Sequence, residues 1–191
     1  TDKTAEIVAS FHEKDSRIKY FYNSTNKGSA FSRNLAIQEA KGKWIAFLDS
    51  DDLWHPEKLE KQIEFMTRND IHFSYTNYCE IDESSKEVGV LISGPEVITN
   101  KLMRAYCWPG CLTVMYDAEF LGLMQTAEIK INEEYALWIK ISSVANCYLL
   151  DENLAKYRRH NNSLTDKSYL ELTKWHYIMF RVAEGKNIIA S

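Results

Sequence analysis

The stretch Gly42-Lys43-Trp44-Ile45-Ala46-Phe47-Leu48-Asp49-Ser50-Asp51-Asp52 runs from a glycine through five apolar residues into three carboxylates. An unbroken apolar run such as 44–48 is typical of a strand that is buried on both faces in a parallel sheet. In open α/β sheets, ligands bind beyond the carboxyl ends of the strands. The carboxylates that follow the run are therefore expected to lie at a binding site.

The segments around this strand alternate between helical and strand patterns. Helices are expected over 2–11, 29–40 and 56–68, and a short aromatic strand is expected over 18–22. Such βα alternation predicts an α/β fold with a mostly parallel sheet flanked by helices.

The second half of the chain is less regular. Strands are expected over 71–81, 111–116, 147–150 and 155–159, with 88–92 as a further segment that can pair with the first of these. Helices are expected over 99–106, 133–142 and 167–182. The last helix is amphipathic, and it can pack on its own domain, lie on a membrane surface or form a dimer contact.

The composition fits one globular domain of 191 residues with a sizeable core, because 45% of the residues are hydrophobic and 13% are aromatic. A net charge of −4 argues against a general nucleic-acid binder. No apolar run is long enough to span a bilayer. The four cysteines form no CxxC pair, so we interpret them as buried thiols in a reducing compartment, which predicts a cytoplasmic protein.

Three carboxylates within the four residues 49–52 repel one another unless a cation compensates them. Oxygen ligands of this kind suit Mg²⁺ or Mn²⁺, and a metal held by them can bind a diphosphate. The alternative is a solvated acidic turn that caps the next helix. We assign that capping role to Asp52, and the functional role to Asp49 and Asp51.

Phosphatases of the haloacid-dehalogenase type also carry Asp-x-Asp after an apolar strand. They follow the second Asp, after one residue, with Thr or Val, whereas this chain has Leu53 at that place. The phosphatase interpretation is therefore ranked well below a metal-dependent diphosphate site.

Several ordered motifs along the chain resemble the family 2 glycosyltransferases, which have the GT-A fold. Each motif is weak alone, but their joint order and spacing are specific and extend to about Thr165. The matching stretches are Thr1-Asp2-Lys3-Thr4, Asn26-Lys27-Gly28 with Arg33-Asn34, Gly42 to Asp52 with Pro56-Glu57-Lys58-Leu59, Glu133-Glu134-Tyr135-Ala136-Leu137-Trp138, and Tyr157-Arg158-Arg159-His160-Asn161-Asn162-Ser163-Leu164.

The resemblance implies an incomplete GT-A domain over 1–165, followed by a helix and tail over 166–191. Family members begin with a strand, a loop and a helix that precede the segment matched at Thr1, and these hold part of the nucleotide. We expect that segment to be missing, and the chain alone to bind the donor poorly.

The resemblance also implies roles for individual residues and a Mn²⁺ or Mg²⁺ cofactor. Arg33 meets the nucleotide or braces Asp49, and Arg158 neutralises phosphate charge. Asn26 and Gly28 also have an ordinary turn interpretation. The donor-binding set is Asp2, Asn26, Gly28, Arg33, Asp49 and Arg158, and the metal set is Asp51, Asp49 and His160.

Inverting transfer needs a carboxylate that takes the proton of the acceptor hydroxyl. By the resemblance, this base is Glu134, with Glu133 as the second choice, although the family motif usually has Asp at the position of Glu134. The alternative is that both residues only stabilise the start of a helix. Residues 108–111 fall where the family has its acceptor loop. The histidines without partners in the sequence are interpreted as surface or core residues: His12, His55, His72 and His176.

The implied reaction moves a sugar from a nucleoside diphosphate to a glycan or lipid-linked acceptor, in surface-glycan or wall-polymer synthesis. A peripheral contact with the inner face of the membrane and a homo-oligomer are compatible with it, and no nucleic-acid partner is expected. Two other functions remain open, a sugar nucleotidyltransferase and an inactive fragment that acts as an interaction module.

Overall fold

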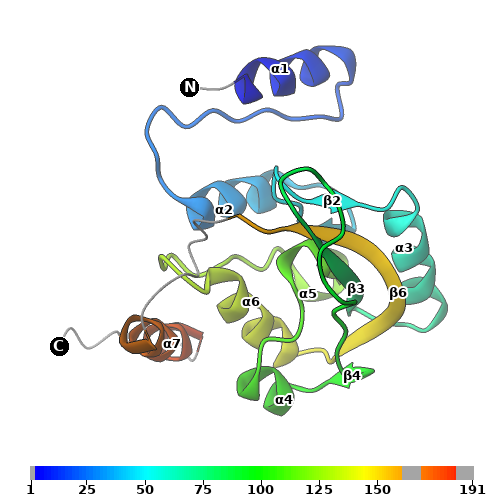
Figure 1. The fold of residues 1–191 in the computed structure, drawn as a ribbon, viewed down its shortest axis with the longest axis vertical. Coiled ribbons are helices and arrows are strands. Elements are labelled where there is room, and N and C mark those ends of the chain that lie inside the picture. Colours follow the sequence, from blue (N-terminus) through cyan, green and yellow to red (C-terminus); the bar gives the residue numbers. More distant parts are fainter. Residues whose placement is uncertain (1–2, 161–168, 184–191) are drawn as a thin grey trace.

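A mixed sheet of six strands forms the centre of the computed structural model, which describes residues 3–160 and 169–183 (Figure 1). The path through the sheet is β1-β5-β3-β6-β2, and β4 pairs with the start of β6. The bounds are Trp44–Ala46 for β1, Leu53–Trp54 for β2, Phe73–Ile81 for β3, Val97–Ile98 for β4, Met115–Asp117 for β5 and Cys147–Arg158 for β6.

The strand directions correct the expectation of a mostly parallel sheet. Only β3 and β6 pair in parallel among the described strands, whereas β5 is antiparallel to both of its neighbours, β1 and β3. Strands β1 and β3 therefore point the same way, and β5 lies between them in the opposite direction. The α/β class with helices on the sheet is confirmed.

Two clusters of apolar side chains cover opposite faces of the sheet. Ile45 and Tyr116 point into the larger cluster, while Met115, the neighbour of Tyr116, points into the smaller one. Side chains alternate between the faces of a strand, so a fully apolar strand serves both clusters. This explains why β1 is apolar throughout and why both Met115 and Tyr116 of β5 are apolar.

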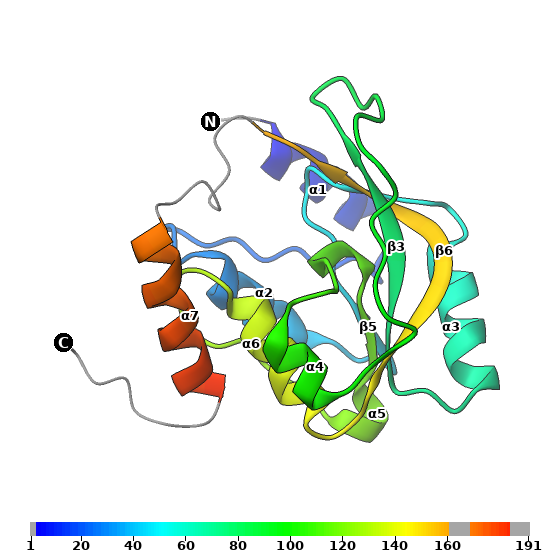
Figure 2. The ribbon, with the colours of Figure 1, turned by 60° about the horizontal axis from the view of Figure 1, so that its bottom comes forward.

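The helices lie on both sides of the sheet (Figures 1 and 2). Met66 of α3 belongs to the smaller cluster, whereas residues of α2, α6 and α7 belong to the larger one. The bounds are Thr4–Lys14 for α1, Ser29–Glu39 for α2, Lys58–Arg68 for α3, Asn100–Ala105 for α4, Ala118–Leu121 for α5, Glu133–Ser142 for α6 and Tyr169–Ala183 for α7.

Helix α6 is the centre of the larger cluster. Its Trp138 is 1% exposed and meets the ring of Phe47 edge-on at 5.5 Å. Helix α7 packs on α6, and its Met179 is fully buried in the same cluster. Packing on the same domain was one of the options predicted for the last helix. The predicted boundary at 165/166 lies within 161–168, outside the described residues, and stays a prediction.

The strand predicted over 18–22 is wrong. Residues 15–28 form an extended connection that leads from α1 to α2, and none of the described strands pairs with it (Figure 1). Phe21 and Tyr22 are exposed among the described residues. The aromatic side chains that suggested a buried strand here are therefore not part of the core. Helix α1 likewise contributes no buried residue.

Two more segments differ from the sequence pattern. The strands predicted over 147–150 and 155–159 are one strand, β6, because a register shift near Thr76 and Asn77 of β3 carries the pairing across Asp151 and Glu152. The segment 111–116 begins as a 3-10 turn before β5. None of the helices in the described part of the chain is long and apolar enough to cross a bilayer.

Candidate active site

The guanidinium of Arg33 joins the acidic loop after β1 to the start of α6. It donates to Asp49 Oδ1 at 2.6 Å, to Glu134 Oε1 at 2.5 Å and to Glu133 Oε1 at 3.1 Å. The Arg33 side chain is only 15% exposed and that of Glu133 6%, so their ion pair is largely shielded from water, whereas the Asp49 side chain is 46% exposed. One cation therefore assembles three carboxylates from distant parts of the sequence. This contact agrees with the alternative that Arg33 braces Asp49.

Local backbone geometry directs Arg33 inward. Gly28 precedes α2 with a φ of 84°, which is a conformation that glycine adopts without strain. The side-chain oxygen of Asn26 accepts the Gly28 N–H at 2.9 Å, which holds this turn. At the first helical position, the Ser29 hydroxyl donates to Glu133 Oε1. Sequence reasoning missed Ser29, because its partner lies about a hundred residues away.

The electrostatics of the cluster favour a basic carboxylate at Glu134. Burial raises the pKa of Glu134, the Arg33 guanidinium lowers it, and the Glu133 carboxylate raises it again, with a net upward shift. For Arg33, burial opposes the charged form, but Glu134 and Asp49 outweigh it and raise the pKa of the guanidinium. A carboxylate with a raised pKa is a better proton acceptor, which suits a general base.

The second carboxylate of the acidic loop, Asp51, lies beside a histidine. His160 Nε2 is 2.9 Å from Asp51 Oδ2, and both side chains are roughly half exposed. The strand β6 ends at Arg158, so the long strand carries His160 to the acidic loop. Two of the three predicted metal ligands, Asp51 and His160, are thus brought together, whereas the third, Asp49, accepts a hydrogen bond from Arg33.

The assignment of Asp52 as a helix cap is wrong. Helix α3 begins at Lys58 and has Glu57 at its N-cap, whereas Asp52 is buried and accepts the backbone N–H of Arg158 at 2.9 Å. Burial raises the pKa of Asp52 to about 6. Asp52 therefore ties the acidic loop to the end of β6.

Arg158 is engaged by protein acceptors. Its side chain donates to the carbonyl oxygens of Asp51 at 2.8 Å and of Asp82 at 2.7 Å, and to the Ser85 hydroxyl at 3.0 Å. These contacts hold the acidic loop against the loop after β3. The predicted contact of Arg158 with donor phosphate stays a prediction.

A divalent cation fits the donor set formed by Asp51 and His160. The described residues contain no group of three or more His, Cys, Asp or Glu side chains that could hold a metal ion alone. Magnesium-type sites often use one or two protein ligands and complete their coordination with substrate phosphates and water. The arrangement therefore suits a cation that is held jointly with a diphosphate.

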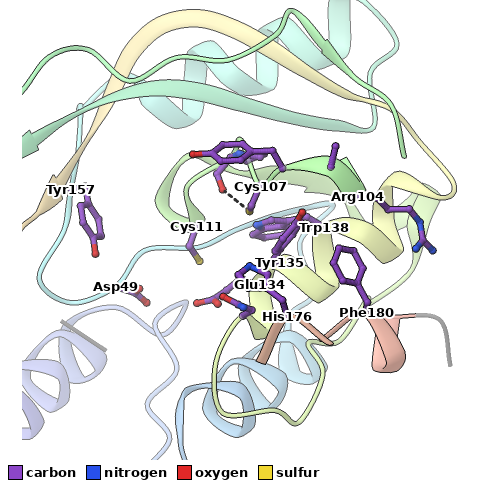
Figure 3. Close-up of a pocket in the computed structure, with 14 residues that line it drawn as sticks. Asp49, Arg104, Cys107, Cys111, Glu134, Tyr135, Trp138, Tyr157, His176 and Phe180 are labelled. Carbon is purple, nitrogen blue, oxygen red and sulfur yellow. Dashed lines mark hydrogen bonds between the residues drawn. The ribbon is translucent and has the colours of Figure 1, made fainter. Parts of the chain in front are cut away.

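A cavity of about 490 Å³ opens next to this cluster and is lined by Asp49 and Glu134 (Figure 3). Its other walls come from the loop 105–111 and from α6 and α7. Both thiols of this loop line it, and burial raises the pKa of Cys107 to about 12 and that of Cys111 well above its ordinary value. The aromatic lining consists of Tyr106, Tyr135, Trp138, Tyr157 and Phe180.

Some residues fall elsewhere than predicted. Gly28 lines a separate hollow of about 340 Å³ near α2, and Asn26 serves the turn before it. Asp2 lies outside the described residues. His176 is exposed, as expected, but it also lines the 490 Å³ cavity (Figure 3), as does Asn132, which was not singled out. Asn132 lies two positions before Glu134 in the sequence, whereas no signal in the sequence connects His176 with Glu134.

A scan against protein-family models matches residues 1–111 to "Glycosyl transferase family 2". Among curated proteins, the chain is 35% identical over 179 residues to the putative teichuronic acid biosynthesis glycosyltransferase TuaG of Bacillus subtilis, covering 93% of this chain and 71% of TuaG. It is 38% identical over 179 residues to the Escherichia coli enzyme WfgD, named UDP-Glc:alpha-D-GlcNAc-diphosphoundecaprenol beta-1,3-glucosyltransferase, covering 91% of this chain and 68% of WfgD.

Solved structures share the fold at low sequence identity. Residues 1–349 of Staphylococcus aureus TarS in complex with UDP superpose with a TM-score of 0.70 at 18% identity, over 100% of this chain. The mannosyltransferase PcManGT of Pyrobaculum calidifontis, in complex with GDP-Man and Mn²⁺, gives a TM-score of 0.55 at 13% identity, again over 100% of this chain. The chain spans 55% of the TarS fragment and 54% of PcManGT.

Proposed function

The chain belongs to glycosyl transferase family 2, and from this premise we propose that it transfers a sugar from a nucleoside diphosphate to an acceptor hydroxyl with inversion. The observation that carries the proposal is the contact of Arg33 with Asp49, Glu133 and Glu134. It holds a carboxylate with a raised pKa next to the acidic loop, at the edge of a cavity large enough for a sugar. These are the parts that a one-step displacement needs.

In the proposed reaction, the acceptor oxygen forms a bond to the anomeric carbon while the bond from that carbon to the phosphate oxygen breaks. The bonding electrons leave with the nucleoside diphosphate, and the acceptor proton goes to the Glu134 carboxylate. Positioning of this base within reach of the hydroxyl supplies the general-base part of the rate enhancement. Glu133 is held by Ser29 and Arg33, so it is suited to orient the cluster.

On the donor side, we propose that Asp51 and His160 hold Mn²⁺ or Mg²⁺ together with the diphosphate, and that Asp49 contacts the donor next to them. Such a cation, when bound, neutralises the charge that develops on the leaving group. Support comes from the 2.9 Å separation of His160 and Asp51 and from the Mn²⁺ complex of PcManGT. Gly28, Asn26 and Asp2 remain proposed donor contacts on the resemblance alone.

We propose a lipid-linked or glycan acceptor in wall or surface polysaccharide synthesis. The names of the two relatives support this, since TuaG is assigned to teichuronic acid biosynthesis and WfgD to a sugar on diphosphoundecaprenol. An acceptor of that kind would bring the protein to the inner face of the membrane as a peripheral partner.

The test is transfer by purified protein with UDP-glucose as donor and a synthetic GlcNAc-diphospholipid as acceptor, with and without Mn²⁺. Other nucleotide sugars serve as further donors. Glu134→Gln keeps the size of the side chain but removes the base, and we expect turnover to fall by about 100-fold or more. Glu60→Gln, a change of the same kind on the exposed side of α3, serves as the control.

Undiminished turnover of Glu134→Gln would remove the base assignment. A wild-type protein that releases no nucleoside diphosphate from any nucleotide sugar, either to an acceptor or to water, would instead favour an interaction module. Formation of a nucleotide sugar and pyrophosphate from a nucleoside triphosphate and a sugar 1-phosphate, in a separate assay, would favour a sugar nucleotidyltransferase.

A further inference from the structure

Arg158 lies at the point where three separate segments of the chain meet. Its Nε donates to the Asp51 carbonyl of the acidic loop at 2.8 Å, and its Nη1 donates to the carbonyls of Asp82 at 2.7 Å and Glu83 at 3.3 Å. Its Nη2 donates to the Ser85 hydroxyl at 3.0 Å. A guanidinium has five N–H groups, so these acceptors within the chain occupy all but one of them.

The backbone of Arg158 is held by the acidic loop as well. The buried Asp52 carboxylate accepts the Arg158 N–H at 2.9 Å, and Asp52 directly follows the carbonyl that the guanidinium binds. His160 comes two positions after Arg158, and its Nε2 lies 2.9 Å from Asp51 Oδ2. Arg158 is therefore joined to Asp51 by a hydrogen bond and to His160 by the chain itself. A residue with these two connections controls how far apart the two proposed metal ligands lie.

The third segment is the turn 82–86, which begins where the paired strands β3 and β6 end side by side (Figure 2). Its own hydrogen bonds hold it, because Asp82 Oδ1 accepts the Ser84 N–H at 2.9 Å, the Ser84 hydroxyl at 2.6 Å and the Lys86 N–H at 3.0 Å. Ser85 has a φ of 67°, in the left-handed region, which is uncommon for a serine and persists where the surroundings determine it. The turn therefore presents its carbonyls and the Ser85 hydroxyl to the guanidinium in a fixed arrangement.

We propose that Arg158 is a positioning residue, which holds Asp51 and His160 side by side for the divalent cation, and that the turn 82–86 braces it from outside the site. The inference rests on the proposed function and extends it to residues that do not touch the metal. Its physical basis is the planar fork of the guanidinium, which binds several acceptors at fixed angles, and the positive charge alone does not supply this. Replacement of groups that orient metal ligands typically lowers metal affinity by about 10- to 100-fold.

Arg158→Lys separates the shape of the side chain from its charge. A lysine stays positive and is able to bind a phosphate, but its single ammonium group cannot reach all three segments. With UDP in excess, we expect the Kd of Mn²⁺, measured from the electron paramagnetic resonance signal of the free ion, to rise by about 10-fold. Affinity for UDP in the presence of a chelator should not change, because no contact with phosphate is lost. Arg159→Lys, at a side chain that is 62% exposed and paired with Glu80, is the matched control.

Ser85→Gly is a milder variant that tests the brace. Glycine keeps the positive φ and removes only the hydroxyl that Arg158 binds. The loss of one exposed hydrogen bond should raise the Kd of Mn²⁺ by about two- to threefold. Asp70→Gly, another replacement at a positive φ on an exposed residue, should leave it unchanged. Urea unfolding of each variant shows whether the fold is kept, and Ser85→Gly decides the question if Arg158→Lys does not fold.

The proposal is overturned if folded Arg158→Lys binds Mn²⁺ as tightly as wild type does, because charge alone then suffices. It is also overturned if its affinity for UDP without metal falls as well, which would indicate a direct contact with donor phosphate, or if Arg159→Lys weakens Mn²⁺ binding to the same extent. Where Arg158→Lys does not fold, wild-type Mn²⁺ affinity in Ser85→Gly overturns it. A wild-type protein that binds no Mn²⁺ with any nucleoside diphosphate would refute the donor side of the proposed function itself, which is a separate outcome.

Discussion

Arg33 and Lys58 are two cations withdrawn from water, and their surroundings are opposite. Arg33 is surrounded by the carboxylates of Asp49, Glu133 and Glu134, which raise its pKa. Lys58 is 0% exposed and donates to the neutral amide oxygen of Gln62 at 2.6 Å. Burial lowers the pKa of Lys58 to about 7.

The neighbours of Lys58 are polar but uncharged. Its Nζ lies 4.6 Å from the centre of the Trp54 ring, and Gln62 passes the hydrogen bonding on to Ser74 and to the carbonyl of Thr113. No ion pair with a described carboxylate lies within 4.0 Å of Lys58. The comparison shows that Arg33, at the cavity, is paired with carboxylates, whereas Lys58, next to Trp54 of β2, has no counter-ion among the described residues. Only the first arrangement can hold reacting groups by charge.

Removal of Arg33 should have the largest effect. Arg33→Met leaves three carboxylates together without a cation. Breaking a fully buried ion pair from one side costs about 3–5 kcal/mol, and we expect a loss of about 2–3 kcal/mol of unfolding free energy here, because the Asp49 side chain is 46% exposed to water. Urea unfolding at pH 7 measures this loss, and glycosyl transfer should vanish in the same protein. Arg33→Lys, which keeps the charge but loses the planar fork, should recover part of the stability. Equal stability of Arg33→Met and wild type would contradict the role given to this cluster.

Replacement of Lys58 should give the next largest effect, and it depends on pH. Because the pKa of Lys58 falls from 10.5 in the unfolded chain to about 7 in the folded one, the unfolded chain binds more protons between these values. Unfolding free energy from this group therefore rises with pH in that window, by about 2–3 kcal/mol between pH 6 and pH 9.

Lys58→Met lacks this dependence, so its stability relative to wild type should decline by that amount as pH rises from 6 to 9. Denaturant unfolding of both proteins at several pH values measures the difference. Lys101→Met, at an exposed lysine of α4, is the control. A difference between Lys58→Met and wild type that stays constant with pH would mean that Lys58 keeps an ordinary pKa.

Glu133→Gln should give the smallest effect. The Glu133 carboxylate is one cause of the raised pKa of Glu134, and transfer requires Glu134 to be deprotonated. Activity is therefore lost as pH falls through a pKa above the usual value of 4.5. Removing the negative charge at 133 should move this acidic limb of kcat/KM to lower pH by less than about one unit. A limb that moves to higher pH would exclude repulsion between the two carboxylates.

The sequence predicted those parts of the molecule that depend on short segments. Helix α6 has the bounds that the pattern of 133–142 indicates, and the apolar run before Asp49 forms β1. The direction of β5 was not predictable in this way, because an apolar run has the same pattern in either direction. The single long β6 was missed because its polar centre, near Asp151, pairs across a register shift in the neighbouring strand.

The residues of the candidate site also fall into those that the sequence identified and those that it did not. Motif residues with a charged side chain, such as Arg33, Asp51 and His160, were identified and are brought together in pairs or larger groups. Ser29 and Asn132 have side chains that turns and helix ends use everywhere, so nothing in a single sequence distinguishes them. For Ser29 the missing information is its contact with Glu133, about a hundred residues away, and for Asn132 it is the cavity that the residue lines; only the folded chain supplies both.

The salt bridges from Arg33 to α6 also set a rule for building chimaeras. The family match ends at residue 111, so Arg33 and Asp49 belong to the matched segment, while Glu133 and Glu134 lie beyond it. A hybrid that joins residues 1–111 of this chain to the remainder of a relative is compatible only if both parents place these four side chains alike. These four side chains form ion pairs across the junction of the two halves. A chimaera with a new acceptor half therefore has to keep all four of them.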